Sequence, residues 1–221
     1  MAKELTLGAM FSSFGDVVGR NFKLFGIVAA VQAVVLALNE TFVPSGARTG
    51  LSLVVSIFIG YHVLEAVLEQ EGLLHDTGSG RRYGSYIGAS ILSGLGMILG
   101  MLLLILPGVL LMARWSVALP FIIGEGCTAT EGMSKSWEAT RGSTWSILAM
   151  YLIFGVLFLV VIGVIGFGAF TAARGGEEPG FLFNLGTNFA SGLIGMGSTA
   201  LSVAIYHLIS GPRERLSDIF A

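Results

Sequence analysis

The sequence is poor in charged residues and in cysteine. Charged side chains make up 12% of the 221 residues and hydrophobic ones 54%, so the chain cannot cover itself with polar surface as a water-soluble domain of this length does. A net charge of −2 and the lack of a basic stripe argue against nucleic acid as a partner. The lone cysteine, Cys127, cannot form a disulfide within the chain. This composition predicts an integral membrane protein.

Long apolar runs define the expected architecture. One of them extends from residue 86 to residue 123, and as a single helix at about 1.5 Å per residue it would far exceed a hydrocarbon core of about 30 Å. We therefore expect a turn at Pro107-Gly108 and a span on each side of it. The sequence predicts one all-α membrane domain over residues 1–221 with six spans. They are expected at about residues 22–38, 51–68, 86–106, 109–123, 145–170 and 189–209.

The fourth predicted span is short. Residues 109–123 fall below the usual length of about 20 residues, and Pro120 can kink a helix. The segment could cross with a tilt, or it could be half of a re-entrant hairpin; we expect a full crossing.

Two further segments have the pattern of interfacial helices. Apolar residues recur at helical spacing through 7–20, with polar ones opposite. Thr128 and Glu131 match the capping-box pattern that opens a helix, which predicts a second surface helix over 128–141. Because no cleavage motif of small residues closely follows the first apolar run, we expect a retained span and not a cleaved signal peptide.

Basic residues predict the topology. Six spans place both termini on the same side, and loops rich in Lys and Arg stay in the cytoplasm. The opposite side carries only Arg48 and Arg174, whereas Arg114 lies within a predicted span. We therefore expect both termini to be cytoplasmic. The basic residues on their side are Lys3, Arg20, Lys23, Arg81, Arg82, Lys135, Arg141, Arg213 and Arg215.

Three stretches carry a family resemblance: Leu106-Pro-Gly-Val109, then Pro120 and Glu125, then Ser136-Trp-Glu-Ala-Thr-Arg-Gly142. With them the chain resembles bacterial six-span inner-membrane proteins of unknown function, which are related to the membrane domain of some glycerophosphodiester phosphodiesterases. The resemblance implies a multi-pass protein of the bacterial inner (cytoplasmic) membrane and assigns no activity. The soluble catalytic domain of those enzymes has no counterpart in this sequence, so its residues cannot be transferred.

Arg114 is the most informative single residue. A charge within an apolar span is costly unless it reaches the interface or finds a partner. Arg114 could bind a lipid phosphate or a carboxylate, with Lys135, Trp137 and Arg141 as further anion contacts on the adjoining surface. The alternative is a guanidinium that extends to the interface or binds carbonyls freed by the turn at Pro107.

A polar cluster is expected at the cytoplasmic helix ends. His62, Glu65 and Glu69 share one helix face at spacings of three and four, and His207 lies at a similar depth. Helical-bundle metal sites draw carboxylates from several helices, and the other spans offer few. We therefore expect no metal and no cofactor, and a headgroup-level role for these side chains.

Three functional classes remain open. We expect a non-catalytic protein, a scaffold or accessory subunit, whose partners are membrane lipids and, as further candidates, other membrane proteins or a second copy. The alternative is a transporter or channel for a lipid or small amphiphile. It draws on Arg114 and on the pairs Tyr61-His62 and Tyr206-His207, which suggest a duplicated hairpin, although chance similarity explains them equally well. The third class is an intramembrane enzyme, against which the absence of a credible nucleophile set argues.

Overall fold

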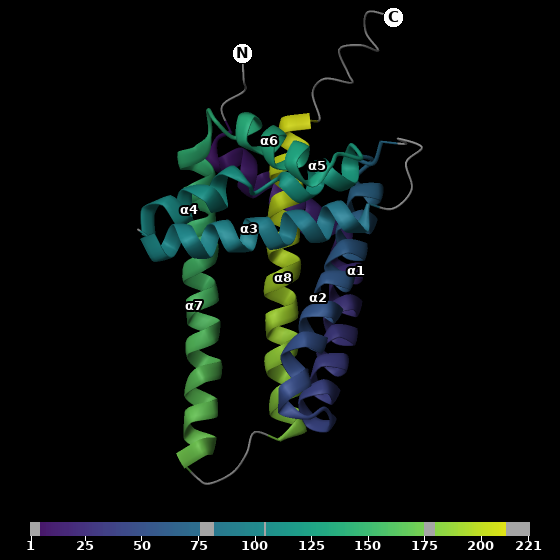
Figure 1. Cartoon of the computed structure of the whole chain (residues 1–221), viewed down its shortest axis with the longest axis vertical. Helices are drawn as coiled ribbons and strands as arrows, with labels where there is room; N and C mark the ends of the chain where they lie inside the picture. The colour runs from purple at the N-terminus through teal and green to yellow at the C-terminus, as the bar shows by residue number, and fades with distance from the viewer. Residues whose placement is uncertain (1–4, 76–81, 104, 175–179, 211–221) are drawn as a thin grey trace, which may run out of the picture. The chain divides into compact units, whose positions relative to one another are not determined.

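The computed structural model describes residues 5–75, 82–103, 105–174 and 180–210 (Figure 1). Every regular element within these ranges is an α-helix, which confirms the all-α class. The helices are α1 (Leu7–Phe42), α2 (Ser45–Gln70), α3 (Tyr83–Leu103), α4 (Ile105–Arg114), α5 (Ala118–Gly124), α6 (Ala129–Ala139), α7 (Thr144–Arg174) and α8 (Phe181–Ser210).

Six segments of the described chain are long and apolar enough to cross a membrane, as expected of a multi-pass protein. The predicted segments 7–20 and 22–38 are parts of one continuous helix, α1. The six are Leu7–Phe42, Gly46–Gln70, Tyr83–Leu102, Pro107–Gly124, Thr144–Gly168 and Phe181–Ser210.

The reversal expected at Pro107-Gly108 falls a few residues earlier, between the end of α3 at Leu103 and the start of α4 at Ile105. Pro107 and Gly108 lie in the first turn of α4, which begins at Ile105. Proline is tolerated at this place because the first N–H groups of a helix have no intrahelical partner to lose. A second interruption, which was not predicted, lies at Trp115–Val117 between α4 and α5, so residues 109–123 do not form one helix.

The chain divides into two compact units. Unit 1 comprises Met1–Arg20, Leu64–Leu152 and Thr199–Ala221, and unit 2 comprises Asn21–Val63 and Ile153–Ser198. Each is described by itself.

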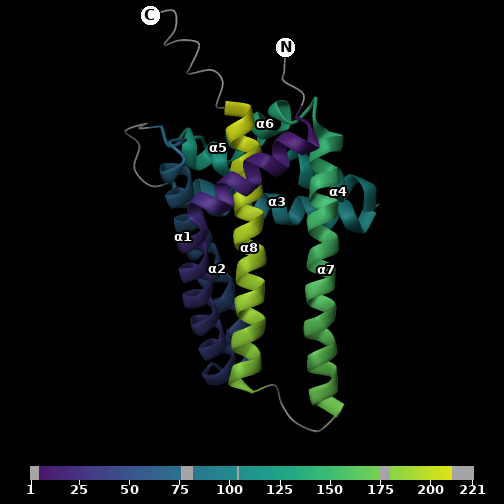
Figure 2. The same ribbon diagram turned by 180° about the vertical axis from the view of Figure 1, so that it is seen from behind.

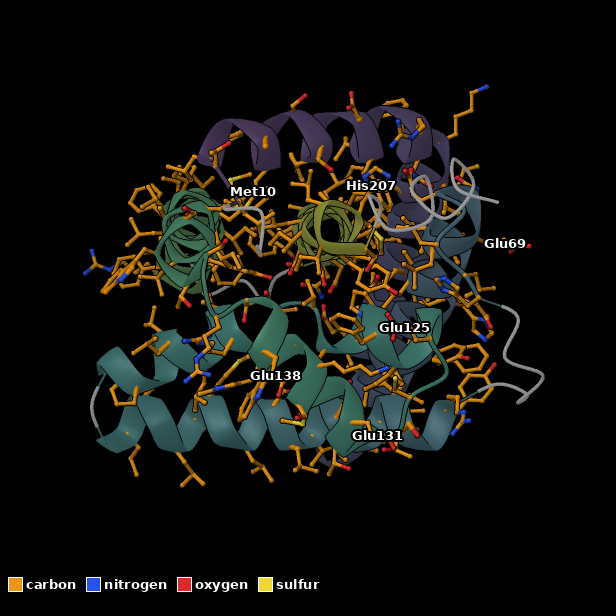
Figure 3. The ribbon with its side chains drawn as sticks, turned by 90° about the horizontal axis from the view of Figure 1, so that it is seen from above. Met10, Glu69, Glu125, Glu131, Glu138 and His207 are labelled. Atoms are coloured by element: carbon orange, nitrogen blue, oxygen red, sulfur yellow. The ribbon has the colours of Figure 1, made fainter. Side chains whose placement is uncertain are left out.

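The core of unit 1 forms around its segment of α8. Leu201, Ile205 and Tyr206 are fully buried there, together with Met10 of α1 and Ile122 of α5. Figure 3 looks along α8 and shows the first part of α1 on one side of it and α5 and α6 on the other. The same crossing of α1 and α8 is seen from behind in Figure 2. The Ser13 hydroxyl of α1 donates to the carbonyl of Ala204 of α8 at 3.2 Å.

Helices α3 to α6 pack against one another in unit 1. α3 contacts α4, α5 and α6, and α5 contacts α6. Glycines permit two close approaches: a Cβ at Gly100 would lie 2.8 Å from Gly108 Cα, and one at Gly132 would lie 2.5 Å from Ile122 Cγ1. A capping box opens α6, as predicted, because Thr128 N–H donates to Glu131 Oε2 at 2.9 Å and the Glu131 N–H donates to Thr128 Oγ1 at 3.4 Å.

Unit 2 consists of the remaining parts of the four long helices. Asn39 Nδ2 donates to Ser52 Oγ at 2.8 Å across the α1–α2 pair, and Asn188 Nδ2 of α8 donates to Glu40 Oε2 at 3.2 Å. Many large apolar side chains of unit 2 are exposed, Phe167 among them. Such side chains suit contact with lipid, because lipid tails are as apolar as the interior of the helix bundle.

Replacing Gly100 with Ala should destabilise the protein by about 1 to 3 kcal/mol, because the new methyl group meets the backbone of α4, which cannot move as a flexible side chain can. Thermal unfolding in detergent measures the effect. Gly94→Ala is the matched control on the same helix: nothing lies within 4 Å of its Cβ position, so its better helix propensity should leave stability unchanged or raise it by up to about 1 kcal/mol. Equal effects of the two substitutions would contradict the close approach.

Candidate functional site

The interruption between α4 and α5 is closed by hydroxyl groups. Ser136, buried on α6, donates from Oγ to the carbonyl of Arg114 at 2.7 Å and accepts the N–H of Val117 at 3.3 Å. Ser202 on α8 donates to the carbonyl of Ser116 at 2.5 Å. Backbone groups freed at a helix break need such partners wherever water is excluded. Side chains from α6 and α8 therefore hold the broken segment.

A ladder of hydroxyl groups continues along α6 and into α7. Thr140 Oγ1, one turn after Ser136, lies 3.3 Å from the carbonyl of Arg114 and 2.8 Å from that of Ser136, to both of which it donates. Thr144 Oγ1 donates to the carbonyl of Thr140 at 3.0 Å. The stretch Ser136–Thr140, which carries part of the family resemblance, thus has a structural task. Sequence reasoning missed it, although two hydroxyls spaced by four residues on one helix face were the available signal.

Arg114 and Trp137 come together at this break. Arg114 Nη1 donates to the carbonyl of Trp137 at 3.2 Å, and the guanidinium lies 5.1 Å from the centroid of the Trp137 ring. The second tryptophan, Trp115, lies with its ring centroid 6.4 Å from that of Trp137. Arg114 is half-buried, and the Trp137 side chain is 42% exposed. One interpretation of the sequence had Arg114 bind backbone carbonyls freed by a turn at Pro107. The guanidinium does bind a backbone carbonyl, but this carbonyl belongs to Trp137 of α6.

The pair retains capacity for an anion. A guanidinium carries five N–H donors, and Nη1 makes the hydrogen bond described above. Stacking on an aromatic face and a planar fork of donors suit recognition of a phosphate or carboxylate. Arg114 and Trp137 thus form a small cationic and aromatic surface at the end of α4.

Lys135 lies in a different network. Its Nζ donates to Glu125 Oε2 at 2.7 Å and to Cys127 Sγ at 3.2 Å, and the hydroxyl of Tyr206 donates to Glu125 Oε1 at 3.3 Å. The hydrogen bonds to Glu125 and Cys127 raise the pKa of the Lys135 ammonium above its usual value. This network ties α6 and the α5–α6 connection to α8. Arg141, the remaining predicted anion contact, is exposed just after α6.

The predicted polar cluster is distributed over both units. In unit 2 the ring of His62 packs edge-on against Phe58, with centroids 4.6 Å apart. Glu65, Glu69 and His207 belong to unit 1, where Figure 3 shows Glu69 pointing outward from α2. Within the described residues, no three His, Cys, Asp or Glu side chains are placed to hold a metal ion.

Glu71 and Arg20 form an ion pair that sequence reasoning did not predict. Arg20 Nε donates to Glu71 Oε1 at 3.0 Å and Arg20 Nη2 to Oε2 at 2.5 Å, while the Glu71 side chain is 2% exposed. This bidentate ion pair links the first part of α1 to the end of α2 within unit 1.

These features define an all-helical membrane domain whose polar side chains mainly connect helices. A family model described as the membrane domain of glycerophosphoryl diester phosphodiesterase matches residues 85–206, more than half of the chain. The chain belongs to this family, which confirms the resemblance. The match covers α4, α5, α6 and α7, and so includes the break and the residues that close it. No curated protein and no solved structure matches the chain.

Ser136→Ala should cost about 1 to 3 kcal/mol of stability, because it leaves the Val117 N–H without an acceptor and removes a donor to Arg114 O. Ser134→Ala, on the exposed side of the same helix, should change stability by less than about 0.5 kcal/mol. Thermal unfolding of both variants in detergent provides the comparison. A Ser136 variant as stable as the Ser134 variant would mean that the break does not depend on this hydroxyl.

Proposed function

We propose that this chain is a non-catalytic, multi-pass protein of the bacterial inner membrane that associates with lipid or with other membrane proteins as a scaffold or accessory subunit. Both termini lie in the cytoplasm in this proposal, because most of the Lys and Arg residues fall in the segments that six spans place on the side of the termini. Of the described ones, Arg20, Arg82, Lys135 and Arg141 belong to unit 1, and Lys23, Arg48 and Arg174 belong to unit 2. Of the other basic residues used for this prediction, Lys3, Arg81, Arg213 and Arg215 lie outside the described residues.

The use of the polar side chains supports a non-catalytic role. The hydroxyls of Ser136, Thr140 and Ser202 hydrogen-bond to backbone carbonyls, and the Lys135 ammonium binds Glu125. Hydrogen bonds of this kind stabilise helix ends and helix packing, so breaking them would lower the stability of the fold. The polar side chains of this region are therefore best explained by the fold.

Arg114 over Trp137 is the observation that carries the lipid association. The pair is partly exposed, so a lipid phosphate can reach the guanidinium that lies over the Trp137 ring. The family description names an enzyme of glycerophosphoryl diesters, and phospholipid headgroups carry the same phosphodiester chemistry. An anionic phospholipid is therefore the partner that we assign to this pair.

Transport of a lipid or small amphiphile is the second candidate. It is favoured by the break between α4 and α5, because transporters commonly bind substrate at interrupted helices. Lipid exchange between the leaflets of vesicles containing the purified protein tests this candidate, and a rate equal to that of empty vesicles would exclude it.

Arg114→Gln should reduce binding of anionic phospholipid by about tenfold or more, since a hydrogen bond to a charged group contributes about 1.5 to 3 kcal/mol. Native mass spectrometry of the protein released from mild detergent, titrated with phosphatidylglycerol and with phosphatidylcholine, measures the affinities.

Arg174→Gln is the matched control, because Arg174 also stacks on an aromatic ring, that of Phe170 at 4.5 Å, but belongs to unit 2. It should bind phosphatidylglycerol like the unmodified protein. Equal binding by the Arg114 variant and the unmodified protein would exclude the proposed lipid site, whereas loss in both variants would point to non-specific charge attraction.

A further inference from the structure

The return from α3 is too short to cross a bilayer in one helix. α4 has 10 residues, or about 15 Å of helix, against a hydrocarbon core of about 30 Å. α5 has 7 residues and is separated from α4 by Trp115–Val117. Pro107–Gly124 is apolar enough to be a candidate span, but it is not one continuous helix.

The chain after α3 runs back beside it. Gly100 lies against Gly108 of α4, Gly96 against the ring of Trp115 at the break, and Gly88 faces Ala129 at the start of α6. As the residue number on α3 falls from 100 to 96 to 88, that of its partner rises from 108 to 115 to 129, so the two segments are antiparallel. α3 thus forms a hairpin with the return segment, which stays beside it along most of its length.

This hairpin lies across the helices that it adjoins in unit 1. In Figures 1 and 2, α3 and α4 extend across the direction of the unit 1 segments of α7 and α8. Figure 3 looks along those segments and shows α3 at its full length. If α7 and α8 cross the membrane, a helix that runs across their direction lies along the membrane plane.

One face of α3 is apolar and uncovered. Five of its residues follow a spacing of four, four, three and four and are 38% to 81% exposed: Ile87, Ile91, Leu95, Ile98 and Leu102. Leu92, Leu99 and Met101 of α3 are exposed as well, so the uncovered face is broader than this stripe. Gly100 and Gly96, which pack on α4 and on the break, lie on the opposite side of α3. α6 in turn exposes charged residues, with Glu131 and Glu138 labelled in Figure 3. An apolar stripe on one helix and charges on its neighbour are the arrangement of a membrane interface.

We propose that α3 to α5 do not cross the bilayer but form a hairpin within one leaflet, with the stripe of α3 in contact with lipid acyl chains and α6 on the water side. The crossing helices are then α1, α2, α7 and α8. Because four crossings also bring the chain back to its starting side, this arrangement keeps the two termini together. It does not depend on the lipid site at Arg114.

Depth-dependent fluorescence quenching tests the hairpin. In a Cys127→Ser background, single cysteines replace Ile87, Leu95 and Leu102, are labelled with bimane and reconstituted in vesicles containing lipids with a nitroxide at a shallow or a deep acyl position. The first and last of the three sites are 15 positions apart, or about 22 Å along the helix. We expect the same ratio of shallow to deep quenching at all three, because the stripe lies at one depth.

Cysteines at Trp145, Val156 and Phe167 on α7 are the control, since these side chains are exposed and α7 is a candidate span. Their ratio should change along the helix, with the strongest deep quenching at Val156. The same profile on α3, deepest at Leu95, would overturn the proposal, and so would α3 sites that neither lipid quenches, because a protein partner would then cover the stripe. Only variants that elute from size exclusion like the unmodified protein are compared.

Discussion

The need to satisfy every backbone N–H and C=O away from water shapes this protein. Long helices such as α7 meet it by themselves, because all but their terminal groups pair internally. The interruption at Trp115–Val117 cannot. Ser136 and Ser202 supply the missing partners there, and they come from α6 and α8. The position of those two helices in unit 1 is thereby linked to a three-residue break in an apolar segment.

Close backbone contact is the second organising feature of unit 1. The approach of Gly100 to Gly108 joins α3 to α4, and that of Gly132 to Ile122 joins α6 to α5. Small residues allow helices to gain dispersion energy where the hydrophobic effect between them is weak. Short helices that could not persist alone are stable here because each is packed against α3 or α8.

The family match covers the segment that holds the break and the residues that close it. The half-buried Arg114 against Trp137 is the feature of unit 1 best suited to a lipid phosphate. By contrast, Lys135, which the sequence grouped with Arg114, binds Glu125 and Cys127. Two cations 21 positions apart on neighbouring helices have different roles, and only side-chain geometry separates them.

Composition and periodicity determined much of this protein. They predicted the all-α membrane class and most helix positions, because these depend on local apolar runs, while short motifs predicted the capping box at Thr128 and the resemblance to the family. The tertiary structure decided that the apolar run is interrupted a second time, after α4. Pro107 is accommodated in the first turn of α4. The helix is interrupted at Trp115–Val117, where the hydroxyls of Ser136 and Ser202 bind the backbone groups that lack helical partners. Hydropathy cannot distinguish a crossing helix from one lying in the membrane plane, since both are surrounded by lipid; the direction of α3 depends on the helices packed against it.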